Sequence, residues 1–251
     1  MLTQQRKHLL LDTLRREGRI VAADLSTALG LSEDTIRRDL RALAAQGLLQ
    51  RVHGGALPAS PAMANFAARS QLHMPGKQAI AAAAAALVQP GQVVFIDGGT
   101  TCQQLALRLP PTLQATVVTH SPTIALALVE HPRIEVQLVG GRLFKHSVVA
   151  VGAAAVEAIG RVRADLYFMG VTGISARVGL STGDMEEAHV KRALMAQSAE
   201  TWVLASAEKL HAASPYVIAP CTDATGLVVE PGTTDQELAA LTALGLALVR
   251  G

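Results

Sequence analysis

The N-terminal quarter of the chain carries apolar side chains at helical spacing, in stretches that end at glycines. Leu10 and Leu14 belong to the first stretch, and Gly18 follows it. Ser32 precedes the last stretch as an N-cap, with acidic residues in the next turn. The pattern predicts helices at 3–17, 21–29 and 33–46, then short strands at 48–52 and 56–57 joined by a turn at Gly54 and Gly55.

After residue 64 the pattern changes to short runs of β-branched and aromatic residues that alternate with helical stretches. The runs predict strands at 93–96, 115–119, 134–139, 166–169, 201–205 and 227–229. The stretches between them predict helices at 76–89, 101–109, 122–130, 152–160, 184–199 and 235–243. Strands that alternate with helices in this way form βα units on a largely parallel sheet.

Pro58, Ala59, Ser60 and Pro61 break both patterns, which predicts a linker at this point. We therefore expect an α+β winged helix-turn-helix followed by an α/β domain with a largely parallel sheet. The expected ranges are 1–57 for the first domain, 58–64 for the linker and 65–251 for the second domain.

The composition is that of a globular protein. The chain has 251 residues, half of them hydrophobic, which is enough for two domains with buried cores. The longest apolar run, 79–88, has ten residues, whereas a membrane helix needs about 20. Charged residues interrupt any signal-peptide core, so we expect a cytoplasmic protein without membrane contact. Cys102 and Cys221 lack the spacing of a zinc finger or a disulfide framework.

The net charge of +2 is unevenly distributed. Residues 1–57 hold nine Lys or Arg against six Asp or Glu, and the remainder has a net charge of −1. The predicted third helix has an apolar face and a basic face, which is formed by Arg37, Arg38 and Arg41. Such a helix fits the major groove of DNA, where Arg pairs with guanine or binds phosphate. A charged face also occurs simply because water solvates it, but the charge asymmetry, the helix order and the predicted wing favour DNA binding.

The segments TIRRDL at 35–40 and GLLQRVHGGA at 47–56 resemble the winged helix of the DeoR family of bacterial sugar-metabolism repressors. In that family this helix reads the operator. The resemblance implies base or phosphate contacts for Thr35, Arg37, Arg38 and Arg41, and contacts to the DNA backbone for Ser32, Arg51 and His53. We expect Asp39 to orient a neighbouring arginine, because phosphates repel a carboxylate.

In the second domain, the predicted strand at 93–96 runs into a loop of Asp97, Gly98, Gly99, Thr100 and Thr101. Glycines let the backbone approach an anion, and hydroxyls with the following helix N-terminus attract it, so this loop is a candidate phosphate cradle. A plain structural turn is the alternative. The loop lacks the lysine of a Walker loop and the GxGxxG of a dinucleotide site.

Small and hydroxyl residues also follow the other predicted strands. They include Thr119, His120, Ser121, Gly140, Gly141, Gly170, Thr172 and Ser206. The carboxyl ends of parallel strands meet at one edge of a sheet, where doubly wound folds open a ligand crevice. Lys191 and Lys209 can reach into such a crevice and neutralise a phosphate, although a lone lysine is more often solvated.

These loops, together with GLST at 179–182 and KRA at 191–193, resemble the successive motifs of the DeoR-type sensor domain, so the resemblance covers nearly the whole chain. That domain is similar in fold to ribose-5-phosphate isomerase and binds a phosphorylated sugar that usually relieves repression. The resemblance implies effector contacts for Asp97, Gly98, Gly99, Thr100, Thr101, Thr119, His120, Ser121, Gly141, Gly170, Thr172, Lys191 and Lys209. The family commonly has Asn at His120 and Asp-Ser-Ser-Lys at 206–209, so ligand contacts there are expected to differ.

The candidates for acid–base chemistry are Asp97, Asp184, Glu186 and Glu187. In the isomerases a catalytic Glu precedes a Lys at a position that resembles Lys191, where this chain has Val190. Their strand-end aspartates correspond to 170–173, which holds no carboxylate. We therefore expect a ligand sensor without catalytic residues. The eight histidines lack the spacing of a metal site, and we expect neither a metal nor a cofactor.

Together these features predict a DNA-binding transcriptional regulator. We expect a repressor of a carbohydrate catabolic operon, whose operator binding a phosphorylated sugar modulates. A helix-turn-helix protein gains from two DNA half-sites, so we expect a homodimer or homotetramer formed through the second domain. The alternatives are a sugar-phosphate isomerase-like enzyme or deaminase with an appended DNA-binding arm, and an activator built from the same parts.

Overall fold

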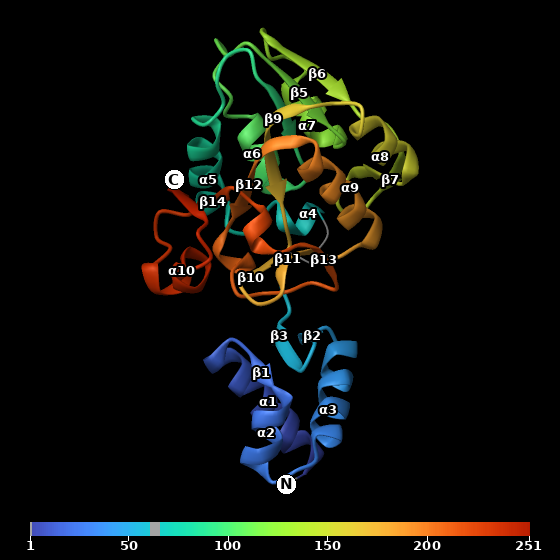
Figure 1. The fold of residues 1–251 in the computed structure, drawn as a ribbon, viewed down its shortest axis with the longest axis vertical. Coiled ribbons are helices and arrows are strands. Elements are labelled where there is room, and N and C mark those ends of the chain that lie inside the picture. The colour runs from blue at the N-terminus through green and yellow to red at the C-terminus, as the bar shows by residue number, and fades with distance from the viewer. Residues whose placement is uncertain (1, 61–65) are drawn as a thin grey trace.

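The computed structural model describes residues 2–60 and 66–251. In the N-terminal part, three helices pack on an antiparallel sheet with the strand order β1-β3-β2. Its elements are α1 (Thr3–Glu17), β1 (Ile20–Val21), α2 (Ala22–Leu29), α3 (Glu33–Ala45), β2 (Leu49–Val52) and β3 (Gly55–Pro58). Figure 1 shows this part as a separate body, from which the chain leaves at the end of β3.

Helix α3 forms where its sequence signals place it. Ser32 Oγ accepts a hydrogen bond from the Thr35 N–H at 3.3 Å, which satisfies a free donor of the first turn. Gly30 separates α2 from α3 with a φ of 62°, a left-handed conformation that glycine adopts without strain. The apolar face of α3 closes the core of this part, which includes Leu10, Leu14, Ile20, Ile36, Leu40, Leu43 and Leu49.

The C-terminal part is built on a seven-stranded sheet, in which all neighbours run parallel in the order β15-β14-β12-β9-β4-β5-β6. Its strands are β4 (Val93–Ile96), β5 (Ala115–Thr119), β6 (Ile134–Leu138), β9 (Ala164–Gly170), β12 (Ser198–Ala205), β14 (Gly226–Val229) and β15 (Ala247–Arg250). Its helices are α4 (Phe66–Arg69), α5 (Met74–Ala85), α6 (Thr100–Ala106), α7 (Pro122–Leu128), α8 (Ala153–Ile159), α9 (Met185–Ala196) and α10 (Asp235–Thr242).

Two smaller β elements lie beside the large sheet. One is a hairpin of β7 (Arg142–Phe144) and β8 (Val149–Val151). The other is an antiparallel sheet of β10 (Gly173–Ser175), β11 (Gly179–Thr182) and β13 (Tyr216–Ala219). Figure 1 places the second of these at the end of the domain that faces the N-terminal part.

Side chains that alternate along the strands of the large sheet are buried on opposite faces. Phe95 belongs to the core that includes α8, α9 and α10, whereas Val94 and Ile96 belong to the core that includes α5, α6 and α7. The sheet is therefore the middle of three layers. Burial on both faces explains why its strands read as short continuous apolar runs.

The strand order reverses between β4 and β9. The chain proceeds from β4 through β5 to β6 on one side, and from β9 through β12 and β14 to β15 on the other. Such a reversal leaves a crevice at the carboxyl ends of the two central strands, where doubly wound folds bind ligands. The loops that follow β4 and β9 border this crevice.

The predicted fold class is confirmed. Every predicted helix and strand is present, with bounds displaced by up to four residues. The sequence pattern did not reveal β1, α4, β15 or the short strands β7, β8, β10, β11 and β13. Within the predicted linker, Pro58 ends β3 and Ala59 pairs with Ala213 in an isolated parallel bridge; positions 61–64 lie outside the described residues.

We expect Leu40→Ala to destabilise the N-terminal part. Leu40 is 1% exposed in its core, whereas Leu48 nearby is 47% exposed. Truncating a buried leucine costs about 2–5 kcal/mol, since it removes apolar burial and leaves a cavity. Differential scanning calorimetry should therefore show a lower Tm for this part in Leu40→Ala and little change in Leu48→Ala. Equal effects of the two substitutions would contradict the placement of α3 in the core.

Candidate functional site

The basic face predicted for the third helix is exposed on α3. Arg37, Arg38 and Arg41 all lie on the side away from the core. Arg37 pairs with Glu33 one turn earlier at 2.5 Å, and Arg41 Nε donates to the Arg37 carbonyl at 3.4 Å. Three long cationic side chains thus project from one face of a helix, as a helix that reads the major groove requires.

Ser32 and Thr35 lie at the start of the same helix. Ser32 Oγ is 2.9 Å from Thr35 Oγ1 and also accepts the Thr35 N–H. Each hydroxyl has one donor and two acceptor sites, so both keep hydrogen-bonding capacity for a phosphate or a water molecule.

The hairpin of β2 and β3 forms the wing beside α3. Arg51 and His53 are exposed on it. A hollow lined by Arg37, Leu40 and residues 51–55 lies between the wing and α3. The structure therefore brings Arg37, Arg51 and His53 around one concave surface.

Asp39 does not share the exposed face of α3. It is 3% exposed, and it accepts a hydrogen bond from Arg6 Nε of α1, which is itself 7% exposed. The arginine that Asp39 orients therefore lies 33 residues earlier in the chain. This buried pair fixes α1 against α3. Sequence reasoning missed Arg6, because no local spacing connects it to α3.

A second candidate site lies in the crevice between β4 and β9, where a cavity holds about 440 Å³ of empty space. Segments far apart in the sequence contribute its walls. The lining residues are Arg69, Lys77, 98–102, Ser147, 170–172, Thr182, Glu187, Lys191, Glu208 and Lys209. Four cationic side chains and two carboxylates therefore surround a space otherwise lined mainly by glycines and hydroxyls.

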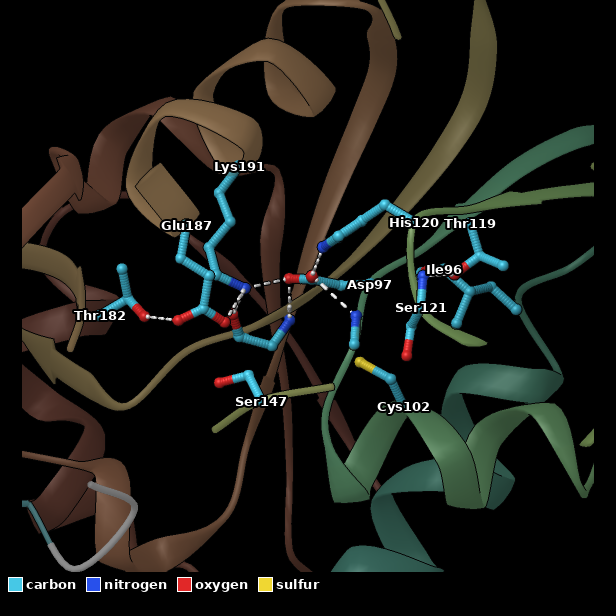
Figure 2. A network of polar contacts seen from close by, with 12 residues as sticks. Ile96, Asp97, Cys102, Thr119, His120, Ser121, Ser147, Thr182, Glu187 and Lys191 are labelled. Carbon is cyan, nitrogen blue, oxygen red and sulfur yellow. Dashed lines mark hydrogen bonds and ion pairs between the residues drawn. The ribbon is translucent and has the colours of Figure 1, made fainter. Parts of the chain in front are cut away.

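Asp97 is fully buried beside this cavity and joins the elements around it (Figure 2). Its Oδ2 accepts hydrogen bonds from Lys191 Nζ at 2.5 Å, from Tyr167 Oη at 2.9 Å and from the Gly170 N–H at 2.9 Å. Its Oδ1 accepts the Gly98 N–H at 2.8 Å. Asp97 is thus a structural anchor that connects β4, β9 and α9, because all of these bonds converge on its carboxylate.

The electrostatics of this anchor keep both partners charged. Burial raises the pKa of Asp97, but Lys191 and the hydrogen bonds outweigh it and lower the pKa below its ordinary value. Burial lowers the pKa of Lys191, but Asp97 and Glu187 raise it above its ordinary value. His120 Nε2 lies 3.4 Å from Asp97 Oδ1, and burial lowers the pKa of this imidazole.

The other three cations of the cavity lack such a close carboxylate partner. Lys77 Nζ donates to the Arg69 carbonyl at 2.7 Å, and Lys209 Nζ donates to Thr101 Oγ1 at 3.3 Å. Arg69 Nη2 donates to Ser147 Oγ at 3.4 Å. Within the described part of the chain, Arg69 Nε is buried without a hydrogen-bond partner. Burial lowers the pKa of all three groups, that of Lys77 to about 8.

The loop after β4 requires its glycines. A Cβ on Gly98 would lie 2.1 Å from Val149 Cγ1, and Gly99 has a φ of 107° that other residues rarely adopt. The chain can therefore turn sharply into α6 and present the Thr100 and Thr101 side chains at the cavity.

The structure brings most of the sequence-predicted effector residues together. Those that line the cavity are Gly98, Gly99, Thr100, Thr101, Gly170, Thr172, Lys191 and Lys209. Asp97 and His120 lie buried beside it. Thr119 Oγ1 instead donates to the Ile96 carbonyl at 2.7 Å, and Ser121 Oγ to the Val148 carbonyl at 3.1 Å. Gly141 is exposed beside β8 and does not line the cavity.

Sequence reasoning assigned no effector contact to several residues of the cavity wall, among them Thr182 and Glu187. Four others bring charge or a hydroxyl from segments that were considered for the site only in passing or not at all. They are Arg69, Lys77, Ser147 and Glu208. The sequence held a signal for Lys77, because it is a lone cation at the start of an alanine-rich helix. In the structure this lysine is 1% exposed. Arg69 and Ser147 lie in segments for which no helix or strand was predicted.

Residues 2–60 and 66–251 contain neither a cluster suited to a metal ion nor a helix suited to a membrane. No group of three or more His, Cys, Asp or Glu side chains there could hold a metal ion. No helix in the same ranges has the length and apolar character needed to cross a membrane.

Comparison with known families matches both parts of the chain. The family described as DeoR-like helix-turn-helix domain matches residues 6–61, and the DeoR C terminal sensor domain matches residues 72–231. The first match contains α3 and the wing, and the second contains most of the cavity wall.

Curated relatives and solved structures resemble the chain to different degrees. The HTH-type transcriptional regulator GlpR of Haloferax volcanii is 34% identical over 240 residues, which cover 94% of this chain and 93% of the relative. The HTH-type transcriptional repressor CsqR of Escherichia coli is 32% identical over 222 residues, which cover 88% and 85%. Ribose 5-phosphate isomerase A from Methanocaldococcus jannaschii aligns with a TM-score of 0.39 and 16% identity, covering 53% of this chain and 52% of that one.

The matches to both domains and the relatives above 30% identity agree with the exposed arginines of α3 and with the cavity of the second domain. This chain belongs to the DeoR family of transcriptional regulators.

Proposed function

We propose that the protein represses a carbohydrate catabolic operon in the cytoplasm and that a phosphorylated sugar in the cavity modulates its operator binding. The excess of cationic side chains around a small polar cavity carries this proposal. Three of them, Arg69, Lys77 and Lys209, are buried at a cost that a bound anion would offset. The relatives that are named repressors support the direction of the regulation.

The phosphate group fits the end of the cavity that the loop after β4 forms. Arg69 Nη1 lies 3.9 Å from the position that a Cβ on Gly99 would take, and Lys209 Nζ bonds to Thr101. Arg69 and Lys209 therefore flank the loop. Charge-assisted hydrogen bonds from Arg and Lys to phosphate are stronger than bonds between neutral groups, and the threonine hydroxyls add further donors.

The remaining wall suits the hydroxyl groups of a sugar. Thr172, Thr182 and Ser147 supply hydroxyls, and Glu187 supplies a carboxylate that accepts from Thr182 Oγ1 at 2.8 Å. Hydroxyls donate and accept, whereas a carboxylate only accepts, so this wall can satisfy several sugar hydroxyls at once.

We propose that the cavity binds its ligand without catalysis. Asp97 is fully buried and engaged by Lys191, and Glu187 is engaged by Thr182. Val190, where the resemblance to the isomerases would place their catalytic Glu, is a buried apolar residue. Neither Asp97 nor Glu187 is therefore a free base, and Glu208, the other carboxylate of the cavity wall, accepts from Ser206 Oγ at 2.7 Å. Conversion of a sugar phosphate into its isomer would instead favour an enzyme with an appended DNA-binding arm.

We propose domain ranges of 1–57 and 65–251, and a homodimer or homotetramer formed through the second domain. Two winged helices bound to two half-sites multiply affinity and specificity. Helix α7 lies against the edge strand β6, and both expose large apolar side chains at Leu126, Val129 and Leu138. Exposed apolar surface of this kind supports self-association.

We expect Arg38→Ala to weaken operator binding about 5- to 150-fold, the range for losing an arginine contact worth about 1–3 kcal/mol. Arg38 is exposed on α3, so the fold should not change. Fluorescence anisotropy with a duplex selected by the wild-type protein from a random pool measures the effect. Arg161→Ala is the matched control, because Arg161 is exposed on the second domain beside Glu157. Unchanged affinity in Arg38→Ala would contradict a DNA-reading role for this face.

We expect a panel of sugar phosphates to contain at least one compound that raises the Tm of the wild-type protein. A ligand that binds only the native state stabilises it in proportion to occupancy. Glucose 6-phosphate, fructose 1-phosphate, fructose 6-phosphate, ribose 5-phosphate and glycerol 3-phosphate form a suitable panel. Lys209→Ala should abolish most of the shift because it removes a cation beside the phosphate. Absence of any shift in the wild type would contradict the proposed effector site.

We expect ligand affinity to fall as the pH rises through about 8, where Lys77 loses its proton, because its pKa lies near this value. The phosphate is already a dianion there, since its second pKa is about 6. Stability of the ligand-free protein should rise over the same range, because the unfolded chain binds the proton more tightly. Isothermal titration calorimetry across this range measures the Kd. Lys77→Arg keeps its charge and should give a flatter profile; a flat wild-type profile would exclude the role of Lys77.

A further inference from the structure

Three buried hydroxyls separate the cavity from the surface that faces the wing. Thr172 lines the cavity, and its Oγ1 lies 2.7 Å from the Oγ of Ser214. The Ser181 carbonyl accepts from Thr172 Oγ1 at 3.2 Å, and the Ser181 hydroxyl accepts the Ser214 N–H at 3.0 Å. The three residues are at most 7% exposed. We refer to Thr172, Ser181 and Ser214 as the hydroxyl cluster.

Ser214 also lines a groove between the two parts of the chain. The wing contributes residues 50–53 to this groove, and the sensor domain contributes Arg177, Val178, Ser214, Pro215 and Val217. The groove separates the facing surfaces of the wing and the sensor domain. Interfaces of this kind between domains permit relative movement.

A backbone contact ties the two sides of the groove together. Ala59, which directly follows β3, pairs in parallel with Ala213, the neighbour of Ser214. The β10–β11 hairpin in turn holds Ala213 closely, because a Cβ on Gly173 would lie 2.8 Å from Ala213 Cα. The position of Ala213 therefore depends on the hairpin and on the hydroxyl cluster.

The hydrogen bonds of the Thr172 hydroxyl connect the position of Ala213 to the cavity. A threonine hydroxyl has one proton, and Thr172 donates it to the Ser181 carbonyl, so Ser214 supplies the proton of the bond between the two hydroxyls. A ligand oxygen that accepts from Thr172 needs that one proton. Rotation of the hydrogen about the Cβ–Oγ1 bond breaks only the bond to the Ser181 carbonyl, whereas rotation of the whole side chain about Cα–Cβ, which carries Oγ1 towards the cavity, also breaks the bond to Ser214.

We propose that the hydroxyl cluster transmits occupancy of the cavity to the winged helix. In the ligand-free protein the bond between Thr172 and Ser214 holds Ala213 where it pairs with Ala59. A ligand that takes the Thr172 hydroxyl releases Ser214, weakens the pairing of Ala59 with Ala213 and frees the winged helix from its operator-binding orientation. This inference rests on the proposed function, because it assumes that the cavity takes a phosphorylated sugar.

The first test removes the hydroxyl of Ser214, which does not line the cavity. Ser214→Ala should bind the duplex weakly even without ligand. The sugar phosphate that shifts the wild-type Tm most should change the DNA affinity of this variant less than about twofold. In a coupled wild type it should change the DNA affinity about 5- to 150-fold. The Tm shift itself should be at least as large as in the wild type, because the ligand no longer has to break the bond to Ser214. Ser198→Ala is the matched control, since it also removes one hydrogen bond donated by a serine hydroxyl, in this case from the start of β12 to the Leu194 carbonyl.

The second test locks the pairing instead of loosening it. Neighbouring strands lie about 4.8 Å apart, which is within the Cα range that a disulfide spans, so Ala59→Cys with Ala213→Cys can form one. The native thiols should not interfere, because burial raises the pKa of Cys102 to about 12 and that of Cys221 to about 11. The oxidised variant should bind the duplex tightly and keep the ligand-induced Tm shift, yet fail to release the DNA. Reduction with dithiothreitol should restore release.

The outcomes separate the inference from the proposed function. A wild-type protein whose Tm and DNA affinity no sugar phosphate changes overturns both. If the wild type responds and Ser214→Ala responds equally, or if the oxidised double-cysteine variant releases DNA as the wild type does, the inference alone is overturned. The expected result is that Ser214→Ala binds DNA weakly and the oxidised double-cysteine variant binds it tightly, with ligand binding retained in both.

Discussion

The buried ion pair between Asp97 and Lys191 holds together the part of the sheet on which the cavity depends. Asp97 directly follows β4, Lys191 lies on α9, and the Gly170 N–H at the end of β9 bonds to the same carboxylate. Removal of one partner from a buried pair leaves an uncompensated charge, at a typical cost of about 3–5 kcal/mol. The three elements around the point where the strand order reverses are thus fixed relative to one another before any ligand binds.

The fixed arrangement of β4, β9 and α9 explains why Lys77 and Lys209 can stay buried without close carboxylates. Lys77 and Lys209 bond to a backbone carbonyl or a hydroxyl, and burial lowers their pKa values. The folded protein therefore carries a desolvation cost that an anion in the cavity relieves. Because neutral ligands of the same shape relieve none of it, the proposal of a phosphorylated sugar instead of a free sugar rests on electrostatics as well as on hydrogen bonds.

The elements of the fold could be predicted from sequence because their signals are local, namely apolar runs, caps and glycines. The loop at 98–101 could be placed at the crevice because parallel strands share one carboxyl edge. Thr119 ends β5 and Ser121 follows it. Strand β5 is separated from the reversal by β4, and the two hydroxyls bond to neighbouring carbonyls. Arg69 and Lys77 could not be foreseen as cavity residues, because only tertiary packing brings α4 and α5 to the ends of strands that follow them in the chain.

The winged helix carries a small positive excess, and Arg37 is already paired with Glu33. Each subunit therefore neutralises few phosphates, and tight binding in the proposed oligomer depends on two winged helices at a fixed half-site spacing. A hydrogen bond such as that between Thr172 and Ser214 is worth only about 1 kcal/mol. In the proposed coupling this bond is lost in both subunits, so the two effects on operator binding multiply, as the gain from the second site does. A weak coupling within each subunit is therefore sufficient to control DNA binding, because binding requires the winged helices of both subunits to be correctly oriented.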